Sequence, residues 1–155
     1  MNKLILKQEV LDAYDAYVKA FIKGDTKEVE NHLSFPNYRF LDGEIKEFNK
    51  FHSNLNELKN KGYRDTIALN IDVVEINEEK AHLVLKEALR VKDNNEPLEE
   101  ISSFYIFIKE NNKDKMNSAR GFQLSSTWPT IKNNVQEKNP RQTFLVHKSW
   151  RGQPR

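Results

Sequence analysis

Four side chains in this sequence could take part in proton transfer or donate a hydrogen bond to a reacting group. Tyr17 lies in the stretch AYVKAFIKGD, on the inner face of an expected helix, where its phenol either packs in the core or takes part in a reaction. His32 is either a general base near neutral pH or a helix-capping, partly exposed imidazole. Asp42 and Glu87 supply the candidate carboxylates.

Glu87 interrupts a strand face whose other members are apolar, namely Leu83, Leu85, Leu89 and Val91. A carboxylate on an inward face is costly unless it is paired. Three interpretations stay open. Glu87 is a pocket acid with a raised pKa, the partner of an arginine such as Arg90 or Arg39, or part of a bulge that turns it outward.

The composition excludes several other chemistries. The chain contains no cysteine, so it has no disulfide, no thiolate nucleophile and no cysteine-bound metal. Its four histidines show no metal-binding spacing, and neither a glycine-rich phosphate loop nor a serine–histidine–aspartate pattern occurs. We therefore expect no metal and no other cofactor.

The bulk properties indicate one well-solvated domain. The chain has 155 residues, 31% of them charged, and a mean hydropathy of -0.79. The N-terminal apolar run is too short for a signal peptide, and no apolar run reaches the roughly 18 residues of a membrane-spanning helix. A cytoplasmic protein that does not enter a membrane is therefore expected.

The domain is expected to cover residues 1–128, because the segment 129–155 differs in charge. This tail holds six basic residues against one acidic residue, a net charge of +5. A basic tail either contacts an anionic partner or is a solvated terminus. We do not expect nucleic acid to be a partner.

Helical spacing of apolar residues predicts the elements that precede the sheet. An amphipathic helix is expected from Leu6 to Ile22, with Gly24 as its left-handed C-terminal cap. Asp25 and Glu28 form a capping box, which predicts a second helix as far as about residue 33. A short strand at 38–41 and a third helix at 44–61 are expected next.

After residue 63 the apolar period changes to two. Strands are predicted from 67 to the turn at 77–80, from 81 to 91, from 98 to 108 and from 120 to 128. Helices followed by four consecutive strands make an α+β domain with a curved antiparallel sheet.

The stretch from Tyr17 to Asp25, together with this order of elements, resembles the nuclear transport factor two-like superfamily. That superfamily includes ketosteroid isomerases, SnoaL-like polyketide cyclases and limonene epoxide hydrolases. The resemblance implies that the sheet wraps around the N-terminal helices to form a cone, whose open end holds an apolar pocket.

The resemblance also implies a role for Tyr17, which matches a tyrosine that donates a hydrogen bond to a developing oxyanion in the isomerases. Asp42 is the acid near the place of the isomerase base, although an aspartate before Gly43 also fits a turn that bonds its own backbone. The position of the second isomerase acid is occupied by the segment 102–105, which contains no acid. The sequence therefore argues against that particular mechanism.

Aromatic side chains are expected to line the pocket and to suit a planar or hydrophobic ligand. The candidates are Tyr14, Phe35, Tyr38, Tyr105 and Trp128. The expected function is binding of a small hydrophobic ligand, with SnoaL-like cyclase or isomerase-type acid–base activity as an extension. The alternative is a non-catalytic scaffold that uses the sheet face and the basic tail. In either case a homodimer is expected, formed through the outer face of the sheet.

Overall fold

The computed structural model describes residues 2–41, 43–109 and 122–134, and within 122–134 the described side chain is that of Leu124. Asp42, the side chain of Trp128 and the tail beyond residue 134 lie outside this description. Among the described residues, no helix is both long and apolar enough to cross a membrane.

Two capped helices open the chain, as the sequence predicts. Helix α1 (Lys3–Lys23) ends at Gly24, whose φ of 74° and ψ of 22° are left-handed. Helix α2 (Thr26–Glu30) is capped by Asp25, whose carboxylate accepts hydrogen bonds from the backbone N–H groups of Lys27 and Glu28 at 3.0 and 3.1 Å. α2 is shorter than expected, because the chain turns into a strand at Leu33.

The predicted third helix is wrong in its first half. Residues 33–48 form a hairpin of strands β1 (Leu33–Leu41) and β2 (Glu44–Phe48), and helix α3 (Leu55–Asn60) follows. The helical spacing was misleading because Ile45 is not a core residue: it lies on a hairpin strand and is 68% exposed. Gly43, with φ of 80°, allows the tight turn.

The four predicted later strands are confirmed, with shifted ends. They are β3 (Asp65–Ile76), β4 (Lys80–Val91), β5 (Pro97–Lys109) and β6 (Phe122–Asn134), with a short 3-10 turn, η1 (Asp93–Asn95), between β4 and β5. The sheet order is β2-β1-β6-β5-β4-β3. All neighbours are antiparallel except β1 and β6, which are parallel.

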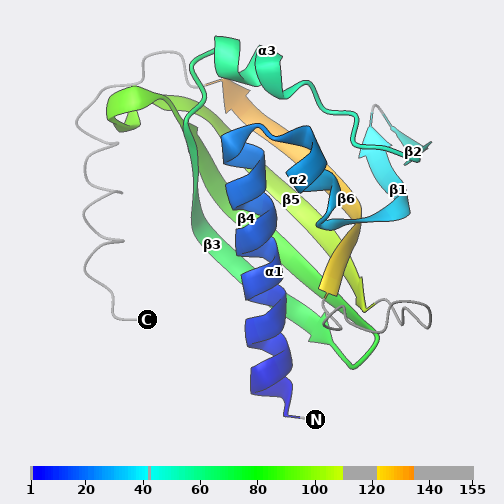
Figure 1. Ribbon diagram of the computed structural model, residues 1–155. Helices are drawn as coiled ribbons and strands as arrows, with labels where there is room; N and C mark the ends of the chain where they lie inside the picture. Colours follow the sequence, from blue (N-terminus) through cyan, green and yellow to red (C-terminus); the bar gives the residue numbers. More distant parts are fainter. Residues whose placement is uncertain (1, 42, 110–121, 135–155) are drawn as a thin grey trace.

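The sheet curves around α1, which lies along its concave face, and α2 and α3 lie near the C-terminal end of α1 (Figure 1). This arrangement buries Leu6, Val10 and Ala20 of α1 against the sheet. At the other end of α1 an ion pair of 2.9 Å joins Glu9 to Lys109 of β5. The expected α+β cone is confirmed.

A bulge in β4 controls which side chains face α1. Leu85 pairs with Ser103 and Ala88 with Ile101, so two residues of β4 stand opposite one residue of β5. Before the bulge the buried positions are odd-numbered, as at Leu83, and after it Ala88 is buried instead. The inward phase of the strand therefore changes at residues 86 and 87.

Replacing Gly24 with alanine should lower the free energy of unfolding by about 1–2 kcal/mol, because an L-residue is strained in the left-handed region. The added Cβ would also collide with the Lys59 ammonium, which donates a 2.6 Å hydrogen bond to the carbonyl of Lys23. Gly43→Ala is the matched control, since its φ of 80° is similar and no described atom comes within 4 Å of the added Cβ. Urea denaturation measures both variants, and an unchanged stability of Gly24→Ala would contradict the cap.

Candidate functional site

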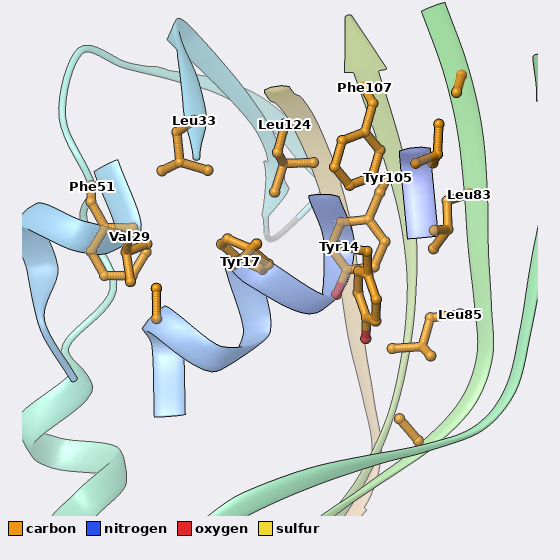
Figure 2. Packing of buried hydrophobic residues seen from close by; sticks show 14 of the residues in the cluster. Tyr14, Tyr17, Val29, Leu33, Phe51, Leu83, Leu85, Tyr105, Phe107 and Leu124 are labelled. Atoms are coloured by element: carbon orange, nitrogen blue, oxygen red, sulfur yellow. The ribbon is translucent and has the colours of Figure 1, made fainter. Parts of the chain in front are cut away.

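Three tyrosines meet between α1 and the sheet (Figure 2). The ring of Tyr105, on β5, lies edge-on to Tyr14 at a centroid distance of 5.4 Å and to Tyr17 at 6.5 Å. Each of the three is at most 7% exposed. Helical spacing places Tyr14 and Tyr17 on the same face of α1, and strand alternation turns Tyr105 towards them.

The hydroxyl groups of these tyrosines differ in their partners. Tyr105 has a hydrogen bond with Ser103. No hydrogen bond to a described residue engages the hydroxyl of Tyr17 or of Tyr14. Because a buried tyrosine hydroxyl usually has a partner, the Tyr17 phenol is a donor that the described part of the chain leaves unused.

Burial keeps these phenols protonated. Desolvation raises the pKa of Tyr14, Tyr17 and Tyr105 above the ordinary value. For Tyr17 the positive charges of Arg39 and Arg90 act in the opposite direction and lower the pKa in part. At neutral pH the tyrosines are therefore neutral hydrogen-bond donors.

Arg39 is one of two arginines beside the tyrosines. Strand alternation in β1 turns it inward, and it is 7% exposed. Its Nη1 donates to the Ser53 hydroxyl at 2.6 Å and lies 3.5 Å from Nδ1 of His52, and its guanidinium lies 5.6 Å from the Phe51 ring centroid. None of these partners is a carboxylate.

Arg90 is the second arginine, and it is paired. Its Nη1 donates to the carboxylate of Glu99, its direct neighbour across β4 and β5. The guanidinium lies over the rings of Phe21 and Tyr63, at 5.7 and 5.8 Å from their centroids. Its Nε is buried and has no hydrogen-bond partner among the described residues.

We call these residues the arginine–tyrosine cluster. It comprises Tyr14, Tyr17, Arg39, Tyr63, Arg90 and Tyr105. It contains donors held at fixed positions by α1, β1, β4 and β5, so it can bind an acceptor or an anion. It contains no unpaired carboxylate or imidazole.

The structure decides among the three interpretations of Glu87. Glu87 is exposed and lies at the β4 bulge, so the third interpretation is correct and an inward-facing acid is wrong. The physical reason is the bulge at residues 86 and 87, which reverses which side chains of β4 face inward. Glu87 therefore faces outward and Arg90 faces inward.

Two other predicted site residues lie away from the cluster. Tyr38 was expected to line the pocket, but it alternates with Arg39, lies on the opposite face of β1, is 38% exposed and bonds to Glu47. His32 is half-buried in the turn before β1, where its backbone carbonyl accepts a bond from Leu124 at 3.0 Å. Neither side chain meets Tyr17 in the described contacts.

Phe35 is half-buried and packs against the core, and its predicted contact with a ligand stays a prediction. Asp42 and the Trp128 side chain lie outside the described residues, so their predicted roles stay predictions.

Away from the cluster, the described residues include a polar hollow, and they contain no group of metal-ligating side chains. The hollow measures about 330 Å³ and lies at the β4–β5 turn, where Arg64 is already paired with Asp93 at 2.6 Å. A search of residues 2–41, 43–109 and 122–134 finds no group of three or more metal-ligating side chains.

Comparisons with known proteins agree on the architecture. No family model matches the chain, and no curated protein matches it significantly. Hexachlorocyclohexane dehydrochlorinase LinA-type3 from Novosphingobium barchaimii LL02 matches with a TM-score of 0.61 at 9% identity, covering 86% of this chain and 90% of that one. An "NTF-2 like protein of unknown function" from Silicibacter pomeroyi DSS-3 matches with a TM-score of 0.52 at 12% identity, covering 85% of this chain and 100% of that one. The chain has the NTF2-like fold.

A third neighbour is described as a hub. The "CaMKII hub" of S. rosetta matches with a TM-score of 0.53 at 16% identity, covering 80% of this chain and 95% of that one. Identities this low concern the fold alone. The neighbours thus confirm the resemblance seen in the sequence, and the chemistry of this NTF2-like chain must come from its own residues.

Sequence reasoning missed the interior roles of Arg39 and Glu99 in this NTF2-like chain. It considered Arg39 and Arg90 only as partners for Glu87. The alternation along β1 was a usable signal, because a strand that turns Tyr38 outward must turn Arg39 inward. Glu99 had no such signal, since its partner depends on the β4 bulge.

The buried phenols of the folded protein should ionise at higher pH than those of the unfolded chain. Burial raises the pKa of Tyr63 to about 12, against about 10 for a free phenol. Because the unfolded chain releases these protons first, the free energy of unfolding should fall as the pH rises above about 10. Phenolate absorbance during a pH titration measures this, with Tyr63→Phe as the control that removes one step. Ionisation of all five tyrosines near the free value in the folded protein would contradict it.

Proposed function

We propose that this NTF2-like domain binds a small organic ligand at the arginine–tyrosine cluster, with the Tyr17 hydroxyl as a hydrogen-bond donor. The observation that carries the proposal is that Tyr17 is 7% exposed and its hydroxyl has no acceptor among the described residues. Neighbouring aromatic rings supply the apolar contacts that a planar ligand needs, for example Phe21 at 6.1 Å from the Tyr17 ring.

The cluster favours binding over acid–base catalysis. General base catalysis needs a carboxylate or imidazole within hydrogen-bond reach of the reacting proton. Glu99, the buried carboxylate beside the cluster, is paired with Arg90, and Glu87 and His32 lie elsewhere. Isomerase-type or SnoaL-like activity would therefore depend on Asp42 as the base.

The ligand proposal is tested with 2-acetylnaphthalene, a planar neutral ketone whose carbonyl can accept from a phenol. Its affinity for Tyr17→Phe should be about two- to tenfold weaker than for the wild type, since a neutral hydrogen bond contributes about 0.5–1.5 kcal/mol. Isothermal titration calorimetry gives the dissociation constants.

Tyr38→Phe is the matched control, because this tyrosine lies outside the cluster, and its affinity should equal that of the wild type. Equal affinities of wild type and Tyr17→Phe would remove Tyr17 from the site. Failure of both this ketone and 2-naphthoate to bind the wild type at millimolar concentration would overturn ligand binding.

We also propose that the outer face of the sheet pairs with a second copy of the chain. Val74 of β3 is 50% exposed there, and Val84 of β4 and Ile108 of β5 are half-buried on the same face. Apolar side chains among polar ones are typical of a two-fold interface.

Val74→Lys should weaken the dimer about tenfold or more, because a charge would replace an apolar contact at the interface. Ile5→Lys is the matched control, since Ile5 is 55% exposed on α1, which lies on the concave side of the sheet and away from this face. Light scattering coupled to size-exclusion chromatography gives the oligomeric state. A monomeric wild type, or equal effects of the two variants, would contradict the proposed interface.

A further inference from the structure

The charges beside Tyr17 do not balance. Arg90 lies 5.7 Å from the ring centroid of Phe21, which packs against Tyr17 at 6.1 Å. Arg39 lies 5.6 Å from the ring centroid of Phe51, which packs against the same Phe21 at 6.2 Å. Among the described residues, Glu99 is the carboxylate that pairs with these arginines, and it pairs with Arg90 alone. One positive charge in this part of the interior is therefore uncompensated by the described chain.

Arg39 carries that charge, and part of its hydrogen-bonding capacity is unused. Its described hydrogen bonds go through Nη1, to Ser53 and towards His52. His52 does not balance the charge, because burial, and then Arg39 and Lys46, lower its pKa and favour the neutral imidazole. In the described part of the chain no acceptor engages Nε or Nη2 of Arg39.

Nε and Nη2 form one edge of a guanidinium, and that edge has the geometry to hold a carboxylate through two parallel hydrogen bonds. A second donor is available at Arg90, whose buried Nε has no partner in the described part of the chain. A buried donor without an acceptor is unfavourable, and an anionic acceptor would relieve it.

We infer that the ligand of the arginine–tyrosine cluster is an organic acid with a single negative charge, whose carboxylate is held by the Nε–Nη2 edge of Arg39. The inference rests on the ligand-binding function proposed above and specifies its chemical class.

Two features select a monocarboxylate among anions. One uncompensated guanidinium balances one negative charge, whereas a phosphate monoester brings close to two. The surroundings are aromatic, with Phe51 beneath Arg39 and with Phe21 and Tyr63 around Arg90. Such walls suit a planar apolar body attached to the carboxylate.

The decisive comparison uses 2-naphthoate and 2-naphthamide, which have the same shape and differ in charge. The wild type should bind the carboxylate about tenfold or more tightly than the amide, because hydrogen bonds to charged groups contribute about 1.5–3 kcal/mol. Calorimetric titration at neutral pH gives both constants. Equal affinities would overturn the inference and leave the ligand-binding function standing. If 2-naphthoate, 2-naphthamide and 2-acetylnaphthalene all fail to bind, both the inference and the ligand-binding function are overturned.

Variants assign the preference to Arg39. Arg39→Met should remove the preference for the carboxylate, and Arg39→Lys should retain only part of it, because lysine keeps the charge and loses the two-pronged edge. Arg64→Met is the control, since Arg64 is 71% exposed in its side chain and paired with Asp93 outside the cluster. A preference that survives in Arg39→Met would overturn the assignment. If Arg39→Met does not fold, the ratio of carboxylate to amide affinity in Arg39→Lys and in the wild type still tests the role of Arg39.

Discussion

The bulge in β4 is the constraint on which the interior of this protein depends. A sheet that wraps around a helix must bend, and an extra residue in one strand bends it. The extra residue also exchanges the two faces of the strand beyond it. Glu87 therefore points to solvent, and Arg90 meets Glu99 across the strand pair on the concave side.

The interior that results is more polar than an ordinary core. Leu83, Leu85 and Phe107 are fully or almost fully buried apolar residues, and the same interior also holds arginines, tyrosine hydroxyls and Glu99. Charged groups are buried in proteins only where something compensates them. Here aromatic faces and one carboxylate compensate in part, and the remaining imbalance among the described residues is the basis of the proposed ligand site.

The same fold serves different chemistries because its functional groups sit at few positions. The neighbours include a dehydrochlorinase, at 9% identity, and a CaMKII hub, at 16% identity. In this chain the helix supplies a phenol, and strands β1 and β4 supply guanidiniums. Binding of an organic acid and pairing through the outer face of the sheet use opposite sides of that sheet, so the two proposals are compatible.

The sequence by itself determined the features that depend on local chemistry. Apolar periodicity, the left-handed Gly24 and the Asp25 cap identified α1, α2 and the four long strands, and hence the fold. It also identified Tyr17 as an inward phenol, because helix spacing fixes which residues share a face. A strand was predicted within β1, but β2 was mistaken for the start of a helix, since short apolar spacings fit both periods.

Only the tertiary structure decided the contents of the site. A single bulge reverses the inward phase of a strand, and its position depends on how the whole sheet curves around α1 rather than on the residues at 86 and 87. For that reason the sequence allowed three interpretations of Glu87. The ion pair of Arg90 with Glu99, and the lack of a carboxylate partner for Arg39 among the described residues, depend on the register of the strands.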